Sequence, residues 1–408
     1  MGERVPLWRN RDFMLLQGGQ LLSTFGSGMS QIAYPLLALA LTNSAAKTGY
    51  VGAIQFAPLV LLSGMAGVAA DRFDRRLLMI ASDAAGALAV GVLAAAVLAH
   101  HASFQLILVV AFVDSTAAVV FRAGNSGAFK AVVPQQQLAD AASVSMGRNS
   151  VVILAAPPAG GALFGLVRGL PFLADAISYV FSTVSLLLMQ TPFQETRSSA
   201  DPMRLREGLA YFWRIRFLRT TIGMISASNL AASGVPIVVI ILAHRHGLSG
   251  AAIGGLMALE GVALLAGSLL SPLLRRLLPM RAILLSEFWM ALVYAAFLTY
   301  PSVWVLASAF SLHAFWFPNT DSAMTAYSYI LIPDRLLGRT MAASNTLRAA
   351  SAPIGPVVAG LLLAHASPRL TVFVLAIPVV IAAAAVTLTT AIRDLPRLEA
   401  PHAPARET

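Results

Sequence analysis

Twelve long apolar stretches run through this chain, and they limit its fold more than any other feature. Each is about as long as the 20 residues that an α-helix needs to cross a bilayer. Only 11% of the 408 residues are charged, whereas about 25% is usual in a soluble domain. A helix satisfies its own backbone hydrogen bonds in lipid. We therefore expect an all-α integral membrane protein with twelve transmembrane helices.

The predicted spans form two sets of six. The first set covers 13–42, 48–70, 77–98, 103–128, 139–167 and 170–190. The second covers 217–243, 249–273, 280–299, 303–330, 337–365 and 369–392. These sets predict an N-terminal bundle over 1–190, a cytoplasmic linker over 191–216, a C-terminal bundle over 217–393 and a cytoplasmic tail over 394–408. Segment 203–219 suits either an amphipathic helix on the membrane surface or a solvated linker.

The distribution of positive charge predicts the orientation. If the N-terminus is cytoplasmic, 21 of the 28 Lys and Arg residues lie in cytoplasmic segments and four lie in outside loops. Cytoplasmic loops carry such an excess of positive charge. We therefore expect both termini in the cytoplasm. The net charge of +10 then reflects topology and does not indicate a nucleic-acid partner.

The two halves repeat at a nearly constant offset. Four landmarks recur 199 or 200 residues apart: Gly67–Arg76 with Gly267–Arg276, Arg148 with Arg348, Pro134 with Pro333, and Pro157 with Pro356. Inverted or parallel repeats of this kind build transporters whose binding site lies between the halves near the membrane midplane. The repeat predicts two related six-helix bundles with the site between them.

No pattern in the sequence predicts catalysis. The chain has no cysteine, and it contains no phosphate-binding loop, no Cys/His metal spacing and no Gly-x-Ser-x-Gly motif. We expect no enzyme activity, no catalytic residues, no metal and no cofactor. Without an ATP-binding domain, uphill transport must draw on an ion gradient, and a proton gradient is the default.

Ionisable side chains inside membrane spans are costly and often functional. Candidates for proton coupling are Asp114, Glu260, Asp321 and His313. At an offset of 199 residues, Asp114 corresponds to His313 and Arg122 to Asp321, which suggests two equivalent pairs. We hypothesise that Asp114 or Glu260 carries the proton, with Arg122 as the counter-charge. The alternative is a static polar cluster. Asp175, near the start of the sixth span, is predicted to be structural.

Polar and aromatic residues on the first, fourth, seventh and tenth spans suit a bulky, partly apolar substrate. The candidates are Gln20, Gln31, Tyr34, Phe121, Arg122, Asn229 and Trp316. Each aromatic residue among them can equally be a packing residue.

The segment from Gly67 to Arg76 holds five charges in six residues between two apolar runs. Its residues Gly67, Asp71, Arg72, Arg75 and Arg76 match the signature that follows the second helix of the major facilitator superfamily. The chain resembles that superfamily, although Asp74 stands where the signature most often has glycine. The resemblance implies two bundles around a central cavity lined by the first, fourth, seventh and tenth spans.

The resemblance also implies roles for the loop. Asp71 would meet the N-terminal end of the eleventh helix when the inner gate closes, with Arg72 and Arg76 as partners. The helix dipole favours a carboxylate there. Asp83, two turns after Arg76, is predicted to extend this network. The alternative is that the loop charges only set topology.

Segment 156–161 resembles the Gly-Pro-x-x-Gly-Gly motif of the exporter branch, and 355–360 is similar to it. Its predicted helix-bending residues are Pro157, Gly160, Gly161, Gly355, Pro356 and Gly360. Small residues let helices approach closely and proline bends them. Ordinary helix packing uses the same residues.

Segments 71–76, 132–141 and 333–339 resemble the branch with the enterobactin exporter and macrolide efflux proteins. That implies a monomeric bacterial inner-membrane protein exporting a drug, siderophore or other metabolite by proton antiport. Importers, lysophospholipid flippases and non-transporting scaffolds are the alternatives. Many proton antiporters of the superfamily have arginine where Asp114 stands and an acidic residue where the first span has 26–28 (Gly-Ser-Gly). The usual proton site therefore does not transfer.

Overall fold

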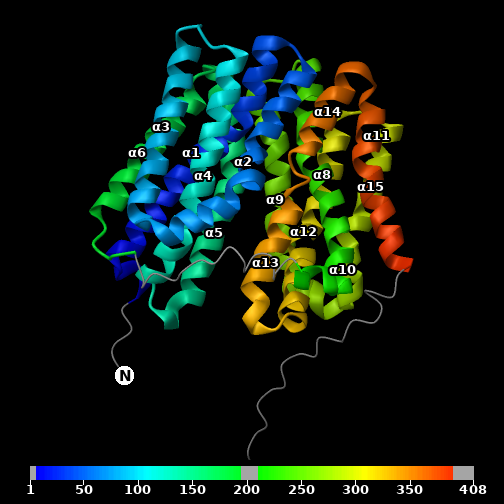
Figure 1. The fold of residues 1–408 in the computed structure, drawn as a ribbon. Coiled ribbons are helices and arrows are strands. Elements are labelled where there is room, and N and C mark those ends of the chain that lie inside the picture. Colours follow the sequence, from blue (N-terminus) through cyan, green and yellow to red (C-terminus); the bar gives the residue numbers. More distant parts are fainter. Residues whose placement is uncertain (1–5, 194–209, 389–408) are drawn as a thin grey trace, which may run out of the picture.

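The computed structural model describes residues 6–193 and 210–388, and these residues contain no strand. The first half forms six long helices (Figure 1), with the short turns η1 (Leu7–Arg9) and η2 (Gln135–Gln137). The helices are α1 (Arg11–Thr42), α2 (Ala45–Arg72), α3 (Arg75–Leu98), α4 (Phe104–Val132), α5 (Leu138–Leu166) and α6 (Leu170–Leu188). Their limits lie close to those of the six predicted spans.

The second half follows the same plan with two interrupted spans. Its continuous helices are α8 (Arg216–Arg245), α9 (Gly250–Leu277), α12 (Val303–Leu331) and α15 (Pro368–Leu388). The ninth span consists of α10 (Met280–Met290), η3 (Ala291–Tyr294) and α11 (Ala295–Thr299). The eleventh consists of α13 (Asp334–Ala349) and α14 (Ile354–His365). Within the described residues, each of the twelve predicted spans is mainly helical.

The predicted linker and tail lie largely outside the described residues, which omit 194–209 and 389–408. Ala210–Arg214 is helical. Phe212 on this turn is fully buried in the core of the C-terminal bundle, and Trp213 is half exposed. This end of the linker therefore packs on the bundle.

Several helices begin at a side chain that caps them. The capping residues are Asn10, Ser44, Asp74, Ser103 and Ser249, each accepting a hydrogen bond from the backbone N–H three residues on. Such caps satisfy N–H groups that have no partner inside the helix. Asp74, the residue that departs from the superfamily signature, accepts from Leu77 N at 2.8 Å, so it starts α3.

The two bundles meet along two seams, α5 against α9 and α2 against α14 (Figure 1). A Cβ atom placed on Gly161 of α5 would lie 2.2 Å from the carbonyl oxygen of Gly250. One placed on Gly49 of α2 would lie 2.3 Å from the carbonyl oxygen of Pro356. Glycine is needed at both seams because the backbones approach too closely for any side chain. Both contacts lie at the end of the molecule away from residue 11.

Other residues of the predicted bending motif also lie at helix crossings. A Cβ on Gly160 would be 2.6 Å from the carbonyl oxygen of Met29 in α1, and one on Gly355 would be 2.3 Å from that of Leu230 in α8. A Cβ on Gly360 would be 2.6 Å from the carbonyl oxygen of Ala45. α5 passes through Pro157 as one helix. These residues permit close packing, and their role in bending stays a prediction.

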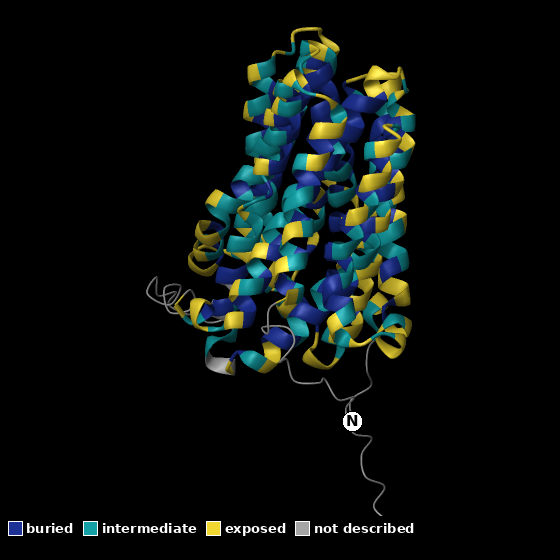
Figure 2. Cartoon of the chain, turned by 90° about the vertical axis from the view of Figure 1, so that its right-hand side faces the viewer, coloured by how far each residue is buried: buried dark blue, intermediate teal, exposed yellow. Residues whose placement is uncertain are grey.

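Ten helical segments in the described part of the chain are long and apolar enough to span a membrane, and α1 and α12 are the long helices outside this group. Large apolar side chains such as Leu88, Leu187 and Leu269 remain exposed, and exposed residues occur along the outer sides of the helices (Figure 2). An apolar outer surface of this extent suits contact with lipid.

Candidate functional site

Asp114 lies in the middle of α4 and points into the N-terminal bundle. Its Oδ2 accepts a hydrogen bond from the Tyr34 hydroxyl at 3.0 Å, and its Oδ1 accepts one from the Tyr179 hydroxyl at 2.6 Å. Tyr34 belongs to α1 and Tyr179 to α6, and all three side chains are buried. The carboxyl group is therefore held inside one bundle, and Tyr34, predicted for the substrate cavity, is its partner.

Asp175 of α6 belongs to the same network. Its Oδ1 lies 3.2 Å from the Ser27 hydroxyl and 3.3 Å from the Ser178 hydroxyl. The Ser27 hydroxyl is also 3.1 Å from that of Tyr179. Asp175 is fully buried, and its Oδ2 has no hydrogen-bond partner in the described part of the chain. The sequence predicts only a structural role, and its connection to Asp114 was missed.

The close approach of α1 and α6 at Asp175 depends on Gly26. A Cβ atom at this position would lie 2.2 Å from the Ser178 hydroxyl and 2.8 Å from Asp175 Oδ1. The first span therefore has no acidic side chain here, and α6 supplies a carboxyl group to the same place.

We expect Gly26→Ala to destabilise the protein by about 1–3 kcal/mol, the usual cost of overpacking. Thermal unfolding in detergent checks this result. The control is Gly18→Ala in the same helix, because nothing lies within 4 Å of a Cβ atom there. Equal unfolding temperatures for the two variants would contradict the expectation.

Asp83 does not extend the loop network in this structure. Its side chain is buried and faces Ser182 of α6. The loop residue Asp71 pairs with Arg75 at 3.5 Å. Arg76 donates to the carbonyl oxygen of Thr191 at 3.0 Å. The loop is thus bonded to itself and to the chain after α6, and contact of Asp71 with the eleventh helix stays a prediction for another conformation.

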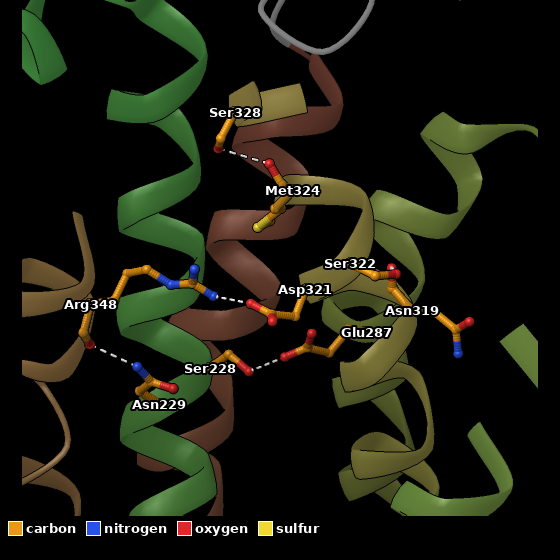
Figure 3. A network of polar contacts seen from close by, with 9 residues as sticks. All are labelled: Ser228, Asn229, Glu287, Asn319, Asp321, Ser322, Met324, Ser328 and Arg348. Carbon is orange, nitrogen blue, oxygen red and sulfur yellow. Dashed lines mark hydrogen bonds and ion pairs between the residues drawn. The ribbon is translucent and has the colours of Figure 1, made fainter. Parts of the chain in front are cut away.

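The C-terminal bundle holds a second polar cluster (Figure 3). The guanidinium of Arg348, near the end of α13, forms an ion pair with Asp321 of α12. Asn229 of α8 donates to the Arg348 carbonyl oxygen at 2.7 Å. Ser228 donates to Glu287 of α10, whose carboxyl group lies near Asp321. The cluster joins α8, α10, α12 and α13.

Glu287 was missed by the sequence reasoning. It is buried and lies in the middle of the predicted ninth span. An ionisable residue inside a membrane span is costly and often functional. This reasoning applies to Glu287 as much as to Glu260, so the sequence alone indicates both residues as candidates.

Glu260 and His313 lie in different surroundings. Glu260 is half-buried, and no hydrogen-bond partner is found for it in the described part of the chain. His313 is buried in α12, with Nδ1 3.3 Å from the Tyr294 hydroxyl. Its Nε2 is buried without a partner among the described residues. The repeat equivalents Asp114 and His313 therefore each lie against phenol groups of their own bundle: Asp114 contacts Tyr34 and Tyr179, and His313 contacts Tyr294.

Arg148 organises the polar side chains of α1, α4 and α5. Its guanidinium donates to Gln17 at 2.9 Å and also to Gln20. Gln20 in turn donates to Asn125 of α4. Arg122, one turn before Asn125, is exposed. Neither arginine has a carboxylate within ion-pair distance in the described part of the chain, whereas Arg348, the repeat equivalent of Arg148, has Asp321.

The remaining candidates for the substrate cavity are scattered. Gln31 is exposed, and its carbonyl oxygen accepts from Gln55 at 3.4 Å. Phe121 is half-buried near Gln20. Trp316 is half-buried and packs edge-on against Phe315, with ring centroids 5.4 Å apart. Gln20 is buried and bound to Arg148. Contact of these residues with a substrate stays a prediction.

Comparison with known proteins gives consistent results. The chain is 25% identical over 402 residues to the multidrug efflux pump Tap of Mycobacterium tuberculosis, covering 92% of each chain. It is 24% identical over 207 residues to macrolide efflux protein A of Streptococcus pyogenes, covering 50% of this chain and 51% of that one.

Two solved structures share the fold. A bacterial homologue of the iron transporter ferroportin in an inward-facing state has a TM-score of 0.71 at 18% identity, covering 93% of this chain and 98% of that one. The nucleoside transporter NupG has a TM-score of 0.72 at 13% identity, covering 94% and 100%. A sequence model described as Major Facilitator Superfamily matches residues 18–354. Together with the twelve helical spans in two bundles, this match shows that the chain belongs to the major facilitator superfamily.

Proposed function

We propose that this transporter exports a bulky, partly hydrophobic molecule from the bacterial cytoplasm in exchange for protons. The observation that carries the coupling is Asp114: a buried carboxyl group inside a membrane bundle whose hydrogen bonds come from two phenols. Burial without a cation favours the neutral form of a carboxyl group. A group of this kind can take up and release a proton as its surroundings change.

The arrangement of the bundles matches one state of an export cycle. The glycine seams close the end away from residue 11. The charge bias of the loops supports a cytoplasmic location for both termini. In that orientation this conformation is closed to the outside, as an exporter is when it takes up substrate from the cytoplasm. Drug efflux is the named activity of relatives that match this chain, and the proposal extends it to this chain in a bacterial inner membrane.

The substrate is proposed to bind near Arg148, where Gln17, Gln20 and Asn125 present amides next to a cation. The half-buried side chain of Phe121, near Gln20, supplies apolar surface. Both bundles belong to one chain, so a monomer contains the complete proposed pathway.

In energised inverted vesicles, Asp114→Asn is expected to abolish accumulation of ethidium, used as the drug probe, because asparagine cannot carry the proton. Glu260→Gln tests the second candidate in the same assay. Asp140→Asn is the control, since Asp140 is exposed at the start of α5. A protonophore is expected to abolish accumulation by the wild type.

If the protonophore does not change accumulation by the wild type, the hypothesis of proton coupling is wrong. If both Asp114→Asn and Glu260→Gln transport as the wild type does, the coupling residue lies elsewhere. Absence of ethidium transport, together with movement of labelled lysophospholipid between leaflets, would replace the drug proposal with the flippase. Coupled uptake of labelled nucleoside into right-side-out vesicles would indicate an importer.

A further inference from the structure

The two buried carboxyl groups of the N-terminal bundle are joined by a chain of hydroxyl groups. Asp114 Oδ1 lies 2.6 Å from the Tyr179 hydroxyl, which lies 3.1 Å from the Ser27 hydroxyl, which lies 3.2 Å from Asp175 Oδ1. We propose that Asp114 and Asp175 form one proton-binding site and share a single proton through Tyr179 and Ser27. This inference rests on the proposed proton antiport and adds Asp175, Tyr179 and Ser27 to its machinery.

The number of hydroxyl protons supports sharing. Ser27 has one proton and lies within hydrogen-bond distance of both Tyr179 and Asp175, so it donates to one and accepts from the other. With the proton on Asp175, Asp175 donates to Ser27, Ser27 to Tyr179 and Tyr179 to ionised Asp114. With the proton on Asp114, every donor reverses: Asp114 donates to Tyr179, Tyr179 to Ser27 and Ser27 to ionised Asp175.

The change between these two arrangements is balanced. Asp175 gives its proton to the Ser27 oxygen, the Ser27 proton moves to the Tyr179 oxygen, and the Tyr179 proton moves to Asp114. Three O–H bonds break and three form, so the network keeps the same number of protons and the same total charge. No other reactant is needed.

The charge environment disfavours ionisation of both groups. From the helices packed against this site, the titratable groups that contact it are Tyr34 on α1 and Tyr179 on α6, while Asp83 on α3 faces Ser182 instead. In the described part of the chain, α2 and α5 place no cation within ion-pair distance of either carboxyl group. Two unpaired buried carboxylates are very costly, so at least one group keeps a proton.

A purely structural role explains the pair less well. Buried polar atoms are normally satisfied, yet Asp175 Oδ2 has no partner among the described residues although the side chain is fully buried. If Asp175 is the protonated member of a shared-proton pair, its unpaired oxygen belongs to a neutral carboxyl group. Burying that oxygen costs less free energy than burying an unpaired oxygen of a carboxylate.

The site joins three helices of the N-terminal bundle, and one of them, α1, packs on a helix that contacts the C-terminal bundle. Ser27 is on α1, Asp114 on α4, and Asp175 with Tyr179 on α6. α1 contacts α5 through Gly160, and α5 contacts the C-terminal bundle through Gly161. A displacement of α1 against α6 would break the chain at Ser27 and trap the proton on one side.

Infrared spectroscopy of the full chain in lipid tests the site without any substrate. The carbonyl band of each protonated carboxyl group is assigned from its loss in Asp114→Asn and Asp175→Asn and is followed against pH. Coupled sites shift one another by about one pH unit or more. We therefore expect Asp175→Asn to move the midpoint of the Asp114 band by about that amount. An unmoved midpoint overturns the proposal.

Tyr179→Phe and Tyr34→Phe form a matched pair, because each removes one phenol donor to Asp114 but only Tyr179 leads to Asp175. Asp175→Asn shifts the midpoint of the Asp114 band, and in a Tyr179→Phe background this shift is expected to be smaller by roughly half or more. In a Tyr34→Phe background the shift is expected to be unchanged. Equal effects of the two variants overturn the proposal. If Asp175→Asn does not fold, Ser27→Ala interrupts the same path of hydroxyl groups. Its control is Ser178→Ala, because Ser178 contacts Asp175 but does not lie on that path.

Failure of this inference can be distinguished from failure of the proposed function. Protonophore-insensitive transport by the wild type removes the antiport proposal while leaving the infrared coupling to be measured. Protonophore-sensitive transport in the wild type, combined with wild-type transport and unmoved midpoints in Asp175→Asn and Ser27→Ala, leaves antiport intact and removes the shared site.

Discussion

Gly161→Leu is expected to prevent closure of the end away from the termini and to reduce transport strongly. The Cβ atom of any side chain at this position would lie 2.2 Å from the carbonyl oxygen of Gly250, which belongs to the backbone and cannot move aside alone. Overpacking costs about 1–3 kcal/mol. A cost of that size, applied to one conformation only, shifts the equilibrium by about 5- to 150-fold.

Disulfide formation between cysteines introduced at Gly165 and Ala251 measures this closure. A Cβ on Gly165 would lie 3.9 Å from Ala251 N, and the chain has no native cysteine, so the cross-link is unambiguous. The yield is expected to fall in Gly161→Leu. The control is Gly255→Leu on α9, where nothing lies within 4 Å of a Cβ. Undiminished cross-linking and transport in Gly161→Leu would show that the seam adapts.

Arg348→Met is expected to give the second large effect, a loss of stability. Arg348 is the cation of a cluster that also holds Asp321 and Glu287. Without it, two neighbouring acidic groups remain in the bundle, one of them buried. Breaking a buried ion pair from one side costs about 3–5 kcal/mol, and the partial exposure of Asp321 reduces this cost.

The double variant Arg348→Met with Asp321→Asn is the key comparison. If the ion pair carries the effect, the double variant is more stable than Arg348→Met alone, with a coupling of about 0.5–3 kcal/mol. Denaturation in detergent measures the three variants. Arg122→Met is the control, because Arg122 is exposed and has no carboxylate nearby in the described part of the chain. If the stability losses of the two single variants simply add in the double variant, the ion pair contributes little to the free energy of unfolding.

The number and limits of the helices could be predicted because most spans are long apolar runs between polar loops. The repeat was equally readable, since Pro134 and Pro333 both stand directly before a helix of their half. The interruptions of the ninth and eleventh spans were not predicted. Pro353 lies at the interruption of the eleventh span, but proline inside α1 and α2 leaves those helices continuous. Proline alone therefore does not predict where a helix is interrupted.

The partners of the charged residues could not be predicted. The sequence suggests Arg122 as the counter-charge of Asp114, while the structure places Asp114 against Tyr34 and Tyr179. Partner choice depends on how each helix is rotated, and a helix that is apolar on most sides gives little periodic signal from which to read that rotation. Asp175 shows the consequence: its position near the end of a span suggests a local role, whereas its side chain points toward Ser27 of α1.

The polarity of α1 has a consequence for synthesis. α1 is less apolar than the ten segments that qualify as membrane spans, yet it is synthesised before α4 and α6. Its Ser27 and Tyr34 find their partners on α4 and α6, which are made much later. Until then these groups face lipid or the insertion machinery unsatisfied. The N-terminal bundle is therefore expected to assemble as a unit once α6 emerges, with α1 held at the insertion site in the meantime.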